Sequence, residues 1–76
     1  MVMKVGDVFR VDQRFPRRES EPRPGDITVY KVVKVGKKAV RFEVRGNNGN
    51  GPIEHATLTN RVAGWIASRD LTNGGT

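Results

Sequence analysis

Few side chains in this sequence could transfer a proton or attack a substrate near neutral pH. His55 is the only imidazole, cysteine is absent, and no base is spaced to activate Ser20 or Ser68. Nucleophilic and acid–base catalysis need a reactive group and a neighbour that orients it, and the spacing indicates no such pair. We therefore expect no enzymatic activity and interpret His55 as a surface strand residue.

Metal and phosphate sites have equally little support. Four aspartates could meet around magnesium, although each also suits a strand start or a turn: Asp7, Asp12, Asp26 and Asp70. The stretch GNNGNG at 46–51 has glycines like those of phosphate loops. It lacks the following lysine, the hydroxyl residue and the helix that such loops require. We expect neither a metal nor a cofactor.

The strongest chemical feature is positive charge. The chain carries a net charge of +6 over 76 residues and has a pI near 10.6. Such an excess favours polyanionic partners. The residues that we predict to contact a protein or a nucleic acid lie in a loop at 12–26 and a hairpin at 30–45: Arg14, Phe15, Arg17, Arg18, Arg23, Tyr30, Lys34, Lys37, Lys38, Arg41 and Arg45.

The stretch RFPRRESEPRPGD at 14–26 predicts a long loop. Its prolines remove backbone donors and hold the residues before them out of the helical region. Pro24-Gly25-Asp26 has the composition of a turn. An exposed Phe15 among arginines would anchor a protein partner, whereas a buried Phe15 would close one end of the fold.

The stretch ITVYKVVKVGKKAVRFEVR at 27–45 predicts a β-hairpin. A type II′ turn at Gly36-Lys37 would place Val33 opposite Val40. One face of the hairpin is then apolar and the other polar. The residues expected to be buried on the apolar face are Val29, Val33, Val40, Phe42 and Val44.

Two residues stand out in this predicted register. Lys31 falls on the apolar face opposite Phe42, which indicates a sheet edge, a bulge or a side chain that reaches out to water. Tyr30 falls on the polar face, where it could stack on one base.

Two further segments have strand-like alternation, 5–11 at the start of the chain and 53–60 after a glycine- and asparagine-rich stretch. We expect 46–52 to be a flexible loop and 73–76 to be a disordered tail. Residues 60–70 are ambiguous. We favour a strand at 64–67 with a short final strand at 71–72, and the alternative is a helix capped by Thr59 or Asn60.

The stretch GWIASRDL at 64–71 resembles the closing segment of Src-homology-3-like barrels. The opening VGDVFRVD, followed by a long loop and a basic hairpin, is similar to small uncharacterised barrel proteins of actinobacterial phages. These resemblances imply an all-β, five-stranded barrel with the long loop after its first strand; the alternative is a sheet plus one C-terminal helix at about 60–70. The proline-peptide groove of signalling Src-homology-3 domains has no clear counterpart here.

The length of 76 residues indicates a single domain with a small core, 1–76. Without a disulfide, apolar packing or self-association as a homo-oligomer must stabilise it. No apolar run approaches the ~20 residues of a membrane span, and the start lacks the apolar stretch of a signal peptide. We expect a cytoplasmic protein that does not bind membranes, in a bacterial host if a phage encodes it.

The predicted function is that of a small basic interaction module that binds a host or phage protein through the loop at 14–26. The alternative is non-specific nucleic-acid binding through the hairpin at 30–45. The salt dependence of the affinity distinguishes the two functions, because binding through phosphate contacts weakens steeply with ionic strength and binding through apolar anchors does not.

Overall fold

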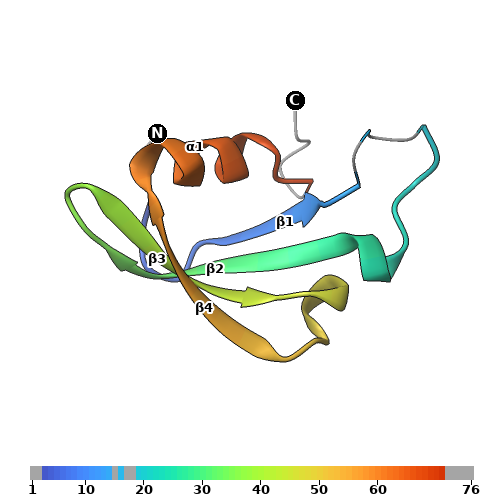
Figure 1. Cartoon of the computed structure of the whole chain (residues 1–76), viewed down its shortest axis with the longest axis horizontal. Coiled ribbons are helices and arrows are strands. Elements are labelled where there is room, and N and C mark those ends of the chain that lie inside the picture. The colour runs from blue at the N-terminus through green and yellow to red at the C-terminus, as the bar shows by residue number, and fades with distance from the viewer. Residues whose placement is uncertain (1–2, 15, 17–18, 72–76) are drawn as a thin grey trace.

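Four antiparallel strands form one sheet in the order β1-β2-β3-β4 (Figure 1). This computed structural model describes residues 3–14, 16 and 19–71. The strands are β1 (Val8–Asp12), β2 (Ile27–Val35), β3 (Ala39–Arg45) and β4 (Ile53–Thr59). The helix α1 (Asn60–Ser68) follows β4, and two short 3₁₀ helices, η1 (Pro24–Asp26) and η2 (Asn47–Gly49), flank the central strands.

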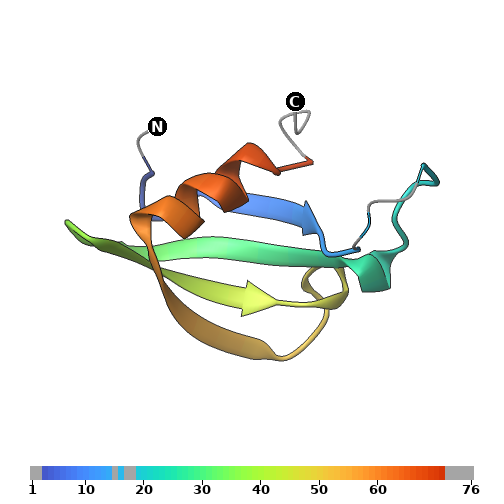
Figure 2. The same ribbon diagram turned by 45° about the horizontal axis from the view of Figure 1, so that its top comes forward.

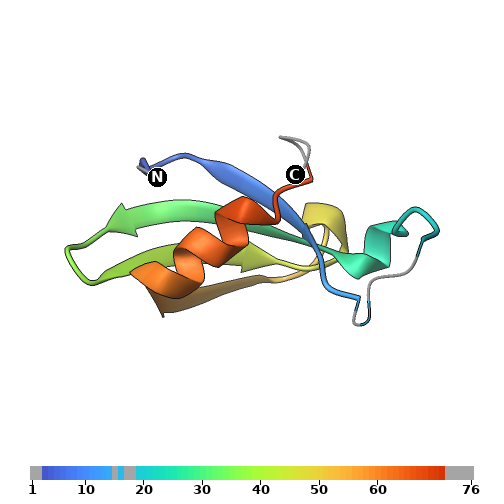
Figure 3. The same cartoon turned by 90° about the horizontal axis from the view of Figure 1, so that it is seen from above.

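The described residues form an open sheet and not the expected five-stranded barrel. Residues 60–68 are helical, so the alternative of a sheet plus a C-terminal helix describes the fold, and the favoured strand at 64–67 is wrong. The helix lies across one face of the sheet (Figures 2 and 3). The physical reason is spacing: Ala63, Ile66 and Ala67 are buried together on one side of α1, which a strand could not achieve.

The start of α1 is fixed by its cap and by the hairpin. The Thr59 side chain accepts a hydrogen bond from the Val62 amide at 3.3 Å, as the capping prediction requires. Asn60 contacts the turn of the β2–β3 hairpin instead: its side chain donates to the Lys37 carbonyl at 2.8 Å, and its amide to the Lys38 carbonyl at 3.2 Å. These bonds bring the helix start and the hairpin turn together.

The core lies between the sheet and the inner side of α1. Phe42 is fully buried at its centre, and Tyr30 packs edge-to-face against it with ring centroids 5.8 Å apart. Burial of a side chain the size of Phe42 is worth about 1.5–3 kcal/mol. The buried cluster consists of Phe9, Val11, Val32, Val40, Phe42, Ala63, Ile66 and Ala67.

The β2–β3 register differs from the prediction. Val32 pairs with Phe42, and the register then shifts across Val33 before Lys34 pairs with Arg41. Lys31 consequently faces out, opposite Glu43. The predicted register would have placed the Lys31 ammonium group in the core, where desolvation is costly. The bulge was one of the three explanations offered for Lys31, but the face assigned to that residue was wrong.

The burial of the hairpin follows the observed register. Val40 and Phe42 are buried as predicted, whereas Val32, expected on the polar face, is fully buried. Val29, Val33 and Val44 are only half-buried. A one-residue shift exchanges the two faces of a strand, which explains why β2 was misplaced and β3 was not.

The hairpin turn lies one residue later than predicted: Gly36 is hydrogen-bonded to Ala39, which leaves Lys37 and Lys38 as the two turn residues. The Gly36 amide donates to the Ala39 carbonyl at 2.8 Å, and Val35 pairs with Val40. Gly36 does not have the positive φ that a type II′ turn requires, so the predicted turn type is also wrong.

The segment after α1 covers part of the free edge of β1. The Leu71 amide donates to the Arg10 carbonyl at 2.8 Å, and the Arg10 amide donates to the Asp70 carboxylate at 3.0 Å. A final strand was expected at 71–72, and in the described residues this hydrogen bond of Leu71 is the part of it that forms. Thr72 and the predicted tail at 73–76 lie outside the described residues. Covered edges are less prone to pair with other chains.

The segment 46–52 folds back onto the outer face of the sheet, the face opposite α1. Asn47, Asn48 and Gly49 have positive φ, a conformation that asparagine and glycine adopt most easily. The Asn48 side chain accepts a hydrogen bond from Arg10 Nε at 2.9 Å. This part of the chain therefore forms a defined turn.

Candidate functional site

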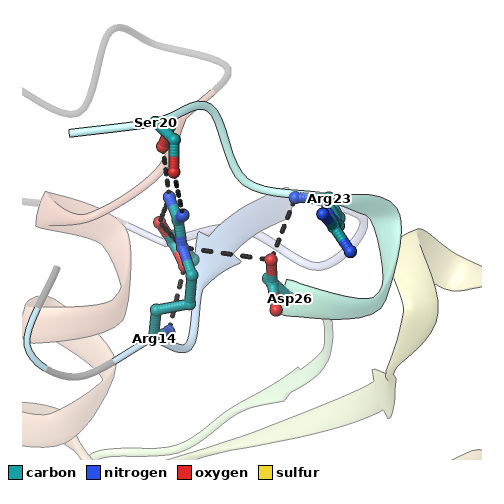
Figure 4. Close-up of polar contacts among 5 residues, drawn as sticks. Arg14, Ser20, Arg23 and Asp26 are labelled. Carbon is teal, nitrogen blue, oxygen red and sulfur yellow. Dashed lines mark hydrogen bonds and ion pairs between the residues drawn. The ribbon is translucent and has the colours of Figure 1, made fainter. Parts of the chain in front are cut away.

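The loop at 12–26 is organised around Arg14. Its guanidinium donates to Asp12, with Nη2 and Oδ2 2.8 Å apart, and to the side chain and backbone of Ser20 at 3.2 and 2.8 Å (Figure 4). Hydrogen bonding to Asp12 raises the pKa of Arg14 above its usual value, so this cation stays charged at any ordinary pH. Only 15% of the Arg14 side chain is exposed. Arg14 therefore joins the described residues on the two sides of the loop and offers little surface to a partner.

A hydrogen bond and an ion pair of Asp26 also stabilise the end of this loop. Asp26 accepts a hydrogen bond from the Arg23 amide at 3.0 Å, and it lies 4.0 Å from Arg14 Nε (Figure 4). The predicted turn at Pro24-Gly25-Asp26 is confirmed as η1. Arg23 itself is exposed. Phe15, Arg17 and Arg18 lie outside the described residues.

The opposite end of the molecule carries a group of exposed cations, which we call the hairpin-end cluster. Lys34 and Arg41 pair on the outer face of β2 and β3, beside a shallow hollow of about 200 Å³. Arg61 follows Asn60, whose two hydrogen bonds join the start of α1 to the hairpin turn. All members are exposed, and none forms an ion pair with a described carboxylate: Lys34, Lys37, Lys38, Arg41 and Arg61.

Two predicted hairpin residues lie elsewhere. Tyr30 is on the core face, half-buried against Phe42, and its hydroxyl accepts a hydrogen bond from Gln13 at 2.9 Å. The prediction of an exposed tyrosine that stacks on a base is therefore wrong. The one-residue shift that buries Val32 also turns Tyr30 toward the core. Arg45 is on the outer face but forms an ion pair with Glu43 at 3.1 Å.

Most carboxylates lie away from the hairpin turn. Asp7, in the turn before β1, is an exception, because its backbone carbonyl accepts a hydrogen bond from the Val32 amide at 2.9 Å, toward the hairpin end of the sheet. Its side chain accepts a hydrogen bond from the Lys4 amide at 2.9 Å, and Asp70 is buried beside Arg10. Glu54 is near the start of β4, at the far end of the sheet from the turn. The remaining acids are at the loop end or paired at mid-sheet: Asp12, Glu19, Glu21, Asp26 and Glu43. The cations of the hairpin-end cluster thus lie apart from most of the described carboxylates, whereas the loop end combines both signs of charge.

The outward side of α1 is a second surface feature, and the sequence interpretation missed it. Trp65 is 50% exposed and Val62 is 40% exposed. The Arg69 guanidinium lies over the indole, 4.8 Å from the ring centroid. The signal was available in the helical alternative, because Arg61, Trp65 and Arg69 are spaced four residues apart and so share one side of a helix.

The residues considered for catalysis and metal binding do not come together. His55 is exposed on β4 opposite Glu43, as predicted for a surface strand residue. In the described part of the chain, no group of three His, Asp or Glu side chains could hold a metal ion. Within the same residues, no helix is long and apolar enough to cross a membrane.

Comparisons of the chain with protein-family models, with curated proteins and with solved structures find no match. Function is therefore inferred from the surfaces of the molecule itself.

Proposed function

We propose that this chain is a small non-enzymatic module that binds nucleic-acid phosphates through the hairpin-end cluster. The observation that supports the proposal is the presence of five exposed lysines and arginines at one end of the molecule without a paired described carboxylate. Cations that are already paired gain little from a phosphate, whereas unpaired cations release counterions from the nucleic acid when they bind it.

Binding of this kind is non-specific. The lysines of the turn are exposed point charges, and the structure does not hold them in the fixed geometry that base recognition requires. We expect a dissociation constant on the order of 10⁻⁴ to 10⁻⁶ M at physiological salt, with little preference for sequence.

Charge reversal at the two ends of the molecule tests the location of the site. Lys37→Glu lies in the hairpin-end cluster, and Arg23→Glu is a matched control at the loop end, because both residues are exposed and both variants lose the same net charge. We expect Lys37→Glu to weaken binding of a labelled duplex at low salt by about fivefold or more, while Arg23→Glu changes it much less. An equal loss from both variants would show that net charge alone, and not the cluster, determines affinity.

The loop at 12–26 is a second candidate, as a surface that recognises a protein. It is supported by the bonds from Arg14 to Asp12 and Ser20, which fix the described residues on both sides of the loop and so reduce the entropy that these residues lose on docking. If neither duplex nor single-stranded DNA binds at low salt, this second function replaces the first. If Arg23→Glu weakens nucleic-acid binding more than Lys37→Glu, the loop is the nucleic-acid site.

A further inference from the structure

The cationic surface continues from the hairpin turn along the outward side of α1. Arg61 is a member of the hairpin-end cluster, and Trp65 and Arg69 follow it at successive helical turns. With a rise of 1.5 Å per residue, these three positions span about 12 Å along the helix axis. The half-exposed indole therefore lies between two arginines.

Trp65 is not required by the core. The inner side of α1 buries Ala63, Ile66 and Ala67 against the sheet, while Trp65 points to the other side and keeps half of its surface exposed. A large apolar ring exposed beside arginines is typical of a recognition surface. The surrounding positive charge makes a polyanion the complementary partner.

We propose that Trp65 stacks on an unpaired base of single-stranded nucleic acid whose phosphates contact the hairpin-end cluster and Arg69. This inference rests on the proposed function and adds the class of ligand. Every base has a face that can stack on an indole, so such a contact tolerates any sequence. The Arg69 guanidinium lies over one face of the ring, so a base that stacks on that face must displace it, and Arg69 can then contact the phosphate next to the stacked base.

The placement of the cations favours a single strand over a duplex. Lys34 and Arg41 lie on the outer face of the sheet, whereas Arg61 lies on the helix that covers the other face and Arg69 directly follows that helix. A flexible single strand can pass around the hairpin end and contact both sides. A duplex is stiff over about 150 base pairs and keeps its bases stacked on one another, so it reaches only one side and offers no base to Trp65.

The test uses the fact that Trp65 is the only tryptophan of the chain, so its fluorescence reports on this position alone. The probes are a twelve-nucleotide oligo-thymidine, an abasic oligonucleotide with the same backbone and length, and a twelve-base-pair duplex. All are used at low salt. Anisotropy of a labelled probe measures binding independently. We expect oligo-thymidine to quench the emission and to bind about fivefold or more tightly than the abasic strand. The abasic strand and the duplex should bind without quenching.

Two variants complete the test. Trp65→Ala should abolish the preference for oligo-thymidine over the abasic strand and leave duplex binding unchanged, and Trp65→Phe should keep part of the preference. If oligo-thymidine binds without quenching, or if Trp65→Ala keeps the preference, base stacking is wrong and the proposed phosphate binding stands. If no probe binds, the proposed function fails as well. Quenching by polyglutamate equal to that by oligo-thymidine would show that Trp65 responds to any polyanion and would overturn the stacking proposal.

Discussion

At the scale of single residues, the contacts that a cation already makes decide whether it can bind a partner. Arg14 is held by Asp12 and Ser20, and Arg45 is paired with Glu43, whereas Lys37 and Lys38 are exposed on a turn. In the sequence these four charges look equivalent. The distinction depends on tertiary contacts, which is why the predicted site combined structural arginines with exposed lysines.

The two aromatic residues show the same limit. Tyr30 was predicted to stack on bases and is half-buried against Phe42, while Trp65 is half-exposed. A shift of one residue in β2 accounts for Tyr30, since neighbouring residues of a strand point to opposite faces. The position of Trp65 follows from the helix, because a strand at 64–67 would have given it different neighbours.

Asp70 offers a test of the contact that closes the edge of β1. It is 1% exposed, and among its contacts it accepts the hydrogen bond of the Arg10 amide. Asp70→Ala leaves that part-buried amide without this acceptor, so we expect the free energy of unfolding to fall by about 1–3 kcal/mol. Asp70→Asn retains an oxygen acceptor and should lose less. Chemical denaturation measures both, and an alanine variant as stable as the wild type would contradict this role.

At the scale of elements, the sequence predicts the four strands well and their pairing less well. Alternation located β1, β2, β3 and β4 to within a few residues, because side-chain periodicity is a local property. The bulge at Val33 and the position of the turn depend on keeping Lys31 out of the core, which involves contacts across the sheet. The favoured strand at 64–67 rested on a short resemblance, and burial of Ala63, Ile66 and Ala67 outweighs it.

Gly64 provides a direct test of the helix. It lies in the middle of α1, and a Cβ atom added there would meet nothing within 4 Å. Glycine is less favourable than alanine inside a helix, so Gly64→Ala should raise the free energy of unfolding by about 0.5–1 kcal/mol. Gly49→Ala is the control: its φ of 91° disfavours any side chain, and this variant should be destabilised. A lower denaturation midpoint for Gly64→Ala would contradict a helix at this position.

At the scale of the whole molecule, charge is distributed unevenly between the two ends. The 12–26 loop lies at one end of the long axis and the β2–β3 turn at the other (Figure 1). The loop end combines arginines with Asp12 and Asp26, whereas the hairpin end collects cations. The net charge of +6 predicted an affinity for polyanions but could not place it. Lys34, Lys37, Lys38 and Arg41 were nevertheless identified from the hairpin pattern, and Arg61 was missed because it joins them only through the contact between Asn60 and the turn.

The salt dependence of binding tests the central claim most directly. The affinity of the wild-type chain for a labelled duplex is measured over a range of salt concentrations and plotted as log association constant against log salt. If the hairpin-end cluster neutralises between two and five phosphates, the slope should lie between about −1.8 and −4.5. Affinity that does not change with salt, or no binding even at low salt, would contradict phosphate recognition by this surface.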